Sequence, residues 1–144
     1  FHVRGRVLHS PDFKTPDKKA NFVSVNATAD DTQTSDFMLM SIRSEGQFNS
    51  IIYEEKDSYR GVDNRWTVLL NLQDALELGV SNGDLVDLTS SQGCMSKVTV
   101  QIFNIARGCA AAYYPEANVL TSRTSDPRSH TPAFKSIPIA IARS

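Results

Sequence analysis

The chain has 144 residues, of which 40% are hydrophobic and 22% charged, a length and balance typical of one globular domain with a real core. Its 15 basic and 16 acidic side chains give a net charge of −1, which disfavours binding of duplex nucleic acid through many phosphates. No apolar run approaches the roughly 20 residues needed to cross a bilayer, so membrane insertion is not expected.

The N-terminal part predicts little regular structure. Residues 1–20 are polar and contain two prolines in "SPDFKTPDKKA", which predicts a leading loop or linker. The β-branched and aromatic residues of "NFVSVNA" predict a short strand over Phe22–Asn26. The nearly continuous apolar run Phe37–Arg43 predicts a strand buried on both faces. Because the chain begins with Phe1 rather than Met, we expect a piece of a longer protein.

A strand over Trp66–Asn71 leads into the clearest helix of the sequence, "NLQDALELGV". Asn71 is a good N-cap, and Asp74 follows where its carboxylate can accept from free backbone N–H groups. Gly79 is placed to end the helix in the left-handed conformation. The helical spacing puts three apolar residues on one face: Leu72, Ala75 and Leu76.

The rest of the chain predicts further strands. "SNGD" and "SQG" predict turns on either side of a strand in "LVDLTS". "MSKVTVQIF" alternates, with Val98, Val100 and Ile102 expected to point inward. Pro138 places the last strand, "SIPIAIA", at a sheet edge or makes it a strand start. Many strands with one clear helix predict a compact barrel or sandwich.

No catalytic constellation is present. The sequence lacks a G-x-S-x-G, H-E-x-x-H, phosphate-binding or dinucleotide-binding glycine motif, and its three histidines are scattered. Cys94 and Cys109 lack the spacing of a zinc or redox pair, which favours reduced, half-buried packing residues and leaves a disulfide open. The pattern favours a binding module over a self-contained enzyme.

Three segments are unusually polar for their positions. "SIRSEGQFNS", Ser41–Ser50, could offer a guanidinium, amides and a carboxylate to a small ligand, or be a hydrophilic loop without a partner. Ala110–Thr121 offers flat tyrosine rings and Asn118 after a proline turn, or is a packing strand and a turn. "SDPRSHTPAFKS", a proline-stiffened loop, carries Arg128 and Lys135, whose charges suit phosphate.

Taken together, these segments resemble the C-terminal molybdopterin-dinucleotide-binding domain of the molybdenum and tungsten oxidoreductases. "FKTPDKKANF" is similar to the family pattern F-x-T-P-x-G-K-A-x-F, with Lys18 in place of glycine. "DALELGVSNGDLVDLTSSQG" is similar to a helix–turn–strand unit of several double-psi barrels. The more specific match is N-x-[LV]-T…D-P-x-S…[FY]-K, represented here by Asn118, Asp126, Pro127, Ser129 and Lys135. Within the family, the sequence of these segments most resembles the formate-dehydrogenase-alpha-like branch.

The resemblance implies a mainly β, double-psi β-barrel-like domain over residues 1–144, with one or two short helices. It implies that this domain binds one molybdopterin guanine dinucleotide (MGD) of a bis-MGD cofactor with molybdenum or tungsten. The metal ligand would lie upstream, and no catalysis is expected from this domain alone. The cofactor-binding residues that it implies are Ser41, Arg43, Ser44, Glu45, Gln47, Phe48, Asn49, Tyr114, Asn118 and Lys135.

A carboxylate should meet the guanine edge, from either Glu45 or Asp126. The expected partners are the cofactor and the remaining domains of a formate-dehydrogenase-like parent, in the cytoplasm. Two other interpretations stay open: a double-psi barrel that recruits proteins or substrates without a cofactor, and a small free-standing barrel enzyme. The second would need a nucleophile or an acid–base pair that the sequence does not offer.

Overall fold

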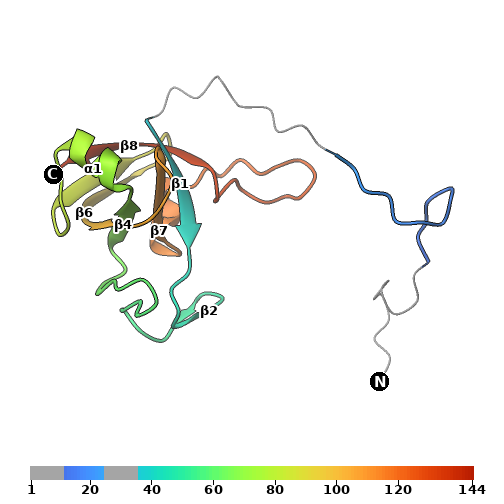
Figure 1. Cartoon of the computed structure of the whole chain (residues 1–144), viewed down its shortest axis with the longest axis horizontal. Helices are drawn as coiled ribbons and strands as arrows, with labels where there is room; N and C mark the ends of the chain where they lie inside the picture. Colours follow the sequence, from blue (N-terminus) through green and yellow to red (C-terminus); the bar gives the residue numbers. More distant parts are fainter. Residues whose placement is uncertain (1–11, 25–35) are drawn as a thin grey trace. The chain divides into compact units, whose positions relative to one another are not determined.

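The structure, a computed structural model, describes residues 12–24 and 36–144. These residues fall in two compact units, 1–32 and 33–144. The larger unit contains the regular elements (Figure 1). They are β1 (Phe37–Ile42), β2 (Gln47–Phe48), β3 (Ile51–Ile52), β4 (Thr67–Leu70), α1 (Leu72–Leu78), β5 (Leu85–Thr89), β6 (Cys94–Ile102), β7 (Cys109–Tyr113), the 3-10 helix η2 (Glu116–Leu120) and β8 (Ile137–Arg143). None of the described helices is long and apolar enough to span a membrane.

Six strands form a closed barrel in the order β1-β7-β4-β6-β5-β8 (Figure 1). The pairs β1–β7 and β4–β6 are parallel, and the other four neighbouring pairs are antiparallel. Strands β2 and β3 form a separate hairpin between β1 and β4. The predicted mainly β, double-psi-like barrel with short helices is confirmed. Because the barrel is closed, β8 pairs with a strand on each side and is not an edge strand. Of the two predicted positions for Pro138, the start of a strand is therefore the one found.

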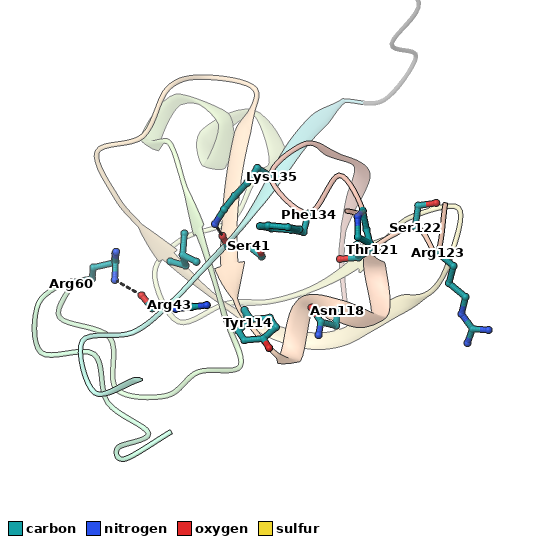
Figure 2. A pocket seen from close by; sticks show the side chains of 12 residues that line it. Ser41, Arg43, Arg60, Tyr114, Asn118, Thr121, Ser122, Arg123, Phe134 and Lys135 are labelled. Carbon is teal, nitrogen blue, oxygen red and sulfur yellow. Dashed lines mark hydrogen bonds between the residues drawn. The ribbon is translucent and has the colours of Figure 1, made fainter. Parts of the chain in front are cut away.

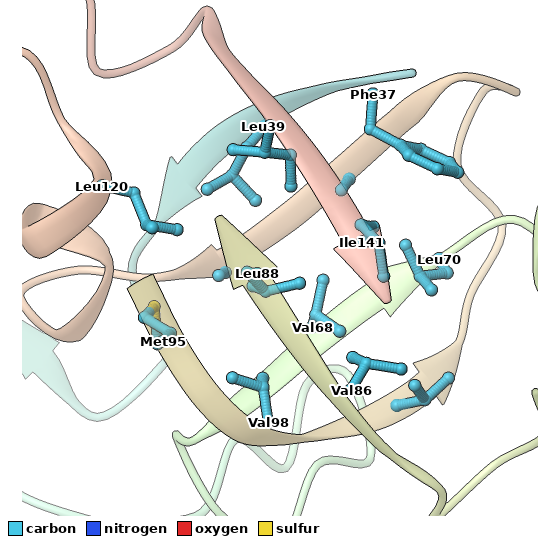
Figure 3. Close-up of a cluster of buried hydrophobic side chains, with 14 of the residues drawn as sticks. Phe37, Leu39, Val68, Leu70, Val86, Leu88, Met95, Val98, Leu120 and Ile141 are labelled. Atoms are coloured by element: carbon cyan, nitrogen blue, oxygen red, sulfur yellow. The ribbon is translucent and has the colours of Figure 1, made fainter. Parts of the chain in front are cut away.

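The core fills the barrel with hydrophobic, mostly aliphatic side chains from all six strands of the barrel (Figure 3). Val98 and Val100 are fully buried as predicted, while Ile102 is only half-buried. The prediction that β1 is buried on both faces is wrong, because Met40 is 39% exposed between buried Leu39 and Ser41. A single-walled barrel has an inside and an outside, so alternate residues of a strand face away from the core.

Helix α1 has the predicted ends. The Asn71 side chain accepts from the Gln73 N–H (2.8 Å), and Gly79 has φ +67. The predicted apolar face is wrong, because Leu76 is 62% exposed and Leu72 is also exposed, leaving Ala75 to pack on the barrel. Asp74 points inward instead of capping the helix. Its carboxylate accepts from the Gly108 N–H (2.8 Å) and from Arg107 (3.1 Å), which fastens α1 to the loop before β7.

Three further sequence predictions concern the N-terminal segment and the two cysteines. Phe22 to Ser24 form no strand, and the rest of the predicted strand Phe22–Asn26 lies outside the described residues. Lys18 forms a turn with Thr15 (N–H to carbonyl, 3.0 Å) at φ +54, the conformation favoured by the glycine of the family pattern. Both cysteines are free, but Cys94 is exposed rather than half-buried, because its side chain lies on the outer face where β6 begins.

Candidate functional site

A pocket of about 930 Å³ opens at the end of β1, between η2 and the loop that precedes β8 (Figure 2). This volume is near the upper end for small-molecule sites. Tyr114 and Asn118 lie on one wall, and Phe134 and Lys135 lie on the opposite wall (Figure 2). The lining consists of Ser41, Ile42, Arg43, Arg60, Tyr114, Asn118, Thr121, Ser122, Arg123, Pro132, Phe134 and Lys135.

Positive charge is concentrated in this pocket, although the whole chain has a net charge of −1. The twelve lining residues include no carboxylate. Such a one-sided lining raises the local concentration of anions and suits phosphate groups, which guanidinium groups bind in a fork and ammonium groups bind as point charges. The four cations are Arg43, Arg60, Arg123 and Lys135, of which Arg123 points away from the others (Figure 2).

Backbone pairing holds the aromatic and cationic groups next to one another. The Tyr114 N–H donates to the Ile42 carbonyl (2.8 Å), which extends the parallel pairing of β7 with β1. The Arg43 guanidinium therefore lies 5.9 Å from the centroid of the Tyr114 ring. On the other wall, Lys135 donates to the Ser41 carbonyl, and its ammonium lies 5.4 Å from the centroid of the Phe134 ring.

The wall formed by η2 offers hydrogen-bonding groups. Asn118 is exposed, and the Thr121 Oγ1 atom is buried with no hydrogen-bond partner among the described residues. A buried hydroxyl without a partner is unfavourable unless a ligand or water meets it. η2 is seated against the turn before β6, where a Cβ on Gly93 would lie 2.6 Å from the Val119 carbonyl oxygen.

Arg60 is held in the pocket by a buried carboxylate. Its Nη1 lies 2.5 Å from Asp57 Oδ2 and donates to the Arg43 carbonyl (3.1 Å). Tyr113 donates its hydroxyl to the same Asp57 oxygen (2.9 Å). Burial raises the pKa of Asp57, but the hydrogen bonds from Arg60 and Tyr113 outweigh it and leave that pKa below its usual value. Burial, together with the bond to Asp57, raises the pKa of Tyr113 far above its usual value.

A profile of the family described as "Molydopterin dinucleotide binding domain" matches residues 37–138, which include the whole pocket lining. The chain belongs to this family. It is 33% identical to Protein YdeP of Escherichia coli (strain K12) over 139 residues, 88% of this chain and 18% of that protein. It is 34% identical to Uncharacterized oxidoreductase Rv2900c of Mycobacterium tuberculosis over 141 residues, 91% of this chain and 18% of that protein.

The molybdopterin-dinucleotide-binding domain thus spans 18% of the length of these curated relatives. Among solved structures, it is similar to acetylene hydratase from Pelobacter acetylenicus, with a TM-score of 0.59 over 76% of this chain and 18% of that chain. At 14% identity, this similarity concerns the fold alone. The predicted molybdopterin-dinucleotide-binding family is confirmed, and the formate-dehydrogenase-like branch stays a prediction.

The residues of this domain fit a pterin dinucleotide. Such a molecule carries a pyrophosphate and flat rings, and the pocket offers grouped cations beside the Tyr114 and Phe134 rings. Thr121, whose hydroxyl has no hydrogen-bond partner in the part of the chain that the structure describes, also belongs to the lining. Within the described residues, no group of three or more His, Cys, Asp or Glu side chains could hold a metal ion.

Five of the ten predicted site residues of this domain line the pocket: Ser41, Arg43, Tyr114, Asn118 and Lys135. The other five, Ser44, Glu45, Gln47, Phe48 and Asn49, do not line it, because the chain turns away from β1 into the β2–β3 hairpin. Ser44 is buried and Phe48 is 64% exposed. Glu45 and Asp126, the two alternatives for the guanine edge, are exposed and outside the lining. All these roles stay predictions.

Several lining residues were not predicted from the sequence. Arg60 lies in an irregular loop and carries no motif, and its bonds to Asp57 and to the Arg43 carbonyl hold it at the pocket. Arg123 lies shortly after Asn118, and its basic side chain was the one feature of the sequence that could have indicated a phosphate-binding residue. Phe134 precedes Lys135 in the family pattern and could have been chosen on that ground.

Proposed function

We propose that this domain binds one molybdopterin guanine dinucleotide of a bis-MGD cofactor that holds molybdenum or tungsten, within a longer, formate-dehydrogenase-like oxidoreductase. The observation that carries the proposal is a pocket whose lining has four cations and no carboxylate, with Arg43 beside the Tyr114 ring and Lys135 beside the Phe134 ring, in a chain of this family. The formate-dehydrogenase assignment is supported by the sequence resemblance, and the relatives include proteins named as oxidoreductases.

In this proposal, Arg43, Arg60 and Lys135 bind the pyrophosphate, and the Tyr114 ring packs on a flat part of the cofactor. Asn118 and Thr121 hydrogen-bond the nucleotide end. The cofactor, when bound, supplies the redox chemistry, while the domain positions it and balances its charge. The remaining domains of the longer protein complete the site and hold the metal ligand. The cytoplasmic location expected from the sequence stays a prediction.

The test uses GDP as a probe, because it carries the guanine and pyrophosphate parts of the dinucleotide. We would titrate the ¹⁵N-labelled chain with GDP and follow the backbone amides by NMR. Losing two polar contacts in Asn118→Ala/Lys135→Ala should weaken binding by about 30-fold or more. The matched control is Asn104→Ala/Lys56→Ala, whose residues are exposed and outside the pocket lining. No GDP-dependent shift at pocket amides, or equal weakening in both variants, contradicts the proposal.

A second assay addresses the complete cofactor. The longer protein would be purified from cells that make active molybdoenzymes, and molybdenum, tungsten and acid-released guanine nucleotide would be measured. We expect metal and guanine in the wild type and their depletion in folded Asn118→Ala/Lys135→Ala. A well-expressed wild type without metal or guanine refutes cofactor binding.

One observation favours the alternative of a protein-interaction module. The β2–β3 hairpin exposes Phe48, Ile51 and Tyr53, and exposed apolar groups of this kind occur at docking surfaces. A cofactor-free wild type together with loss of a protein partner in Phe48→Ser would support that function.

A further inference from the structure

The largest fully buried side chain of the domain is Arg65, which lies just before β4 and is 2% exposed. Its guanidinium holds both oxygens of Glu116, from Nε to Oε1 (2.7 Å) and from Nη2 to Oε2 (3.0 Å). Nη1 donates to Ser44 Oγ (2.5 Å), and Nη2 also donates to the Tyr114 carbonyl. The guanidinium lies 5.2 Å from the centroid of the Tyr113 ring. One side chain therefore joins the end of β1 to the stretch Tyr114–Glu116, two segments that are distant in sequence from each other and from Arg65.

Both of these segments supply residues to the pocket lining, although Arg65 itself is not part of it. Ser44 directly follows Arg43, so the bond to its hydroxyl fixes the end of β1. The Tyr114 carbonyl belongs to the residue whose ring lines the pocket. Glu116 begins η2, which carries Asn118 to the wall.

We infer that Arg65 is a positioning residue that sets the relative placement of Arg43, Tyr114 and Asn118 for the ligand, an inference that rests on the proposed function. Arginine suits this task because its planar fork reaches several acceptors in fixed directions, whereas the lysine ammonium is a point charge on a flexible stem. A buried charge that is paired and hydrogen-bonded is also expensive to move, which keeps these two segments in place relative to each other.

The same network gives Ser44 and Gln47 a role different from direct contact with the cofactor. Gln47 Oε1 accepts from the Ser44 N–H (3.3 Å), and Gln47 Nε2 donates to the carbonyls of Tyr114 (3.0 Å) and Asn49 (2.9 Å). Arg65 and Gln47 therefore meet at the Tyr114 carbonyl. Arg65 and Gln47 therefore both hold the Tyr114 backbone in place without lining the pocket.

The experiment compares Arg65→Lys with the milder Glu116→Gln, which keeps an acceptor for the guanidinium. The matched control is Arg107→Lys, which alters an ion pair with Asp74 and Glu77 away from the pocket. For each variant we would measure thermal stability, the amide NMR shifts of Tyr114 and Asn118 without ligand, and GDP affinity by titration. If Arg65→Lys does not fold, Glu116→Gln carries the same comparison.

We expect Arg65→Lys to move the Tyr114 and Asn118 amides and to weaken GDP binding about tenfold, because small misplacements of contacting groups reduce binding strongly. Glu116→Gln should show the same pattern with a smaller change, and Arg107→Lys neither effect. Loss of thermal stability without amide shifts or weaker binding would overturn the inference and leave Arg65 a stabilising residue only. If wild type does not bind GDP, the proposed function fails, and the ligand-free amide shifts alone decide whether Arg65 positions these segments.

Discussion

Removal of the buried Tyr113 hydroxyl tests the account of the polar network behind the pocket. Tyr113 and Asp57 are both 0% exposed, and the hydroxyl donates to Asp57 Oδ2 over 2.9 Å. The other oxygen of Asp57, Oδ1, is buried with no hydrogen-bond partner among the described residues. Tyr113→Phe therefore leaves the carboxylate with the Arg60 side chain alone on Oδ2.

The size of the effect follows from the charge of the acceptor. A hydrogen bond to a charged group contributes about 1.5–3 kcal/mol, more than a bond between neutral groups. The substitution keeps the ring and adds no volume, so a cavity term should be small. We expect Tyr113→Phe to lower the free energy of unfolding by about 2 kcal/mol near neutral pH.

The effect should depend on pH in a defined direction. The pKa of Asp57 is lowered in the folded protein, so its stabilising contribution is present above the unfolded pKa, near 3.8, and is lost as pH falls through the folded pKa. Tyr113 is one of the causes of the lowered pKa, and its removal should raise that pKa. The difference between wild type and Tyr113→Phe should be largest near neutral pH and shrink in acid.

The assay is urea unfolding followed by the fluorescence of Trp66, the one tryptophan of the chain. Free energies from linear extrapolation would be compared near neutral pH and in acid, below the pKa of Asp57. Tyr59→Phe is the control, since Tyr59 is 82% exposed. A loss below about 0.5 kcal/mol near neutral pH lies within the range of ordinary surface substitutions and would show that the Tyr113 hydroxyl does not stabilise the Asp57 carboxylate. A loss that does not change with pH would contradict a role for the charge of Asp57.

Three further changes test the packing behind η2, the cap of α1 and the charge of the pocket. Gly93→Ala should destabilise the fold by about 1–3 kcal/mol in urea unfolding, because its Cβ would lie 2.6 Å from the Val119 carbonyl; Gly46→Ala, with its nearest contact at 3.3 Å, should do much less, and equal losses would contradict this account. Asn71→Ala should cost about 1 kcal/mol or more, because it removes both the α1 cap and the hydrogen bond from Asn71 Nδ2 to the Ile105 carbonyl (2.7 Å), whereas Asn71→Ser keeps a cap and should lose less; equal losses would show that the cap contributes little. GDP affinity measured by titration should fall as salt is raised, and fall less steeply in Arg43→Gln, because exposed cations are screened; a salt-independent affinity would exclude phosphate binding by these cations.

The local features of the fold were predictable because they depend on neighbours in sequence. The cap at Asn71 and the left-handed Gly79 need only a few adjacent residues. The family pattern around Asn118 and Lys135 likewise identified two residues on opposite walls of one pocket. The alternation in β6 predicted its inward side chains, Val98 and Val100.

The errors share a different cause. The apolar run of β1 indicated burial on both faces, but closure of the barrel left Met40 outside. The spacing of Leu72 and Leu76 indicated a buried helix face, yet both leucines are exposed and α1 instead buries Asp74, which binds Arg107 and the Gly108 N–H, and Ala75. Each outcome depends on contacts between elements that are distant in sequence, which a local pattern does not encode.

The sequence alone was enough to identify the molybdopterin-dinucleotide-binding family, several of the strands and the one α-helix, and five of the twelve residues that line the pocket. Tertiary contacts bring Arg60 beside Arg43 there and place Arg65 behind them, because each is brought into place by a buried carboxylate or carbonyl from another segment. The sequence does not distinguish a loop arginine whose guanidinium is hydrated from one, such as Arg65, whose guanidinium binds the Glu116 carboxylate. Burial makes the difference, since a guanidinium withdrawn from water is stable only where the fold supplies all its acceptors together.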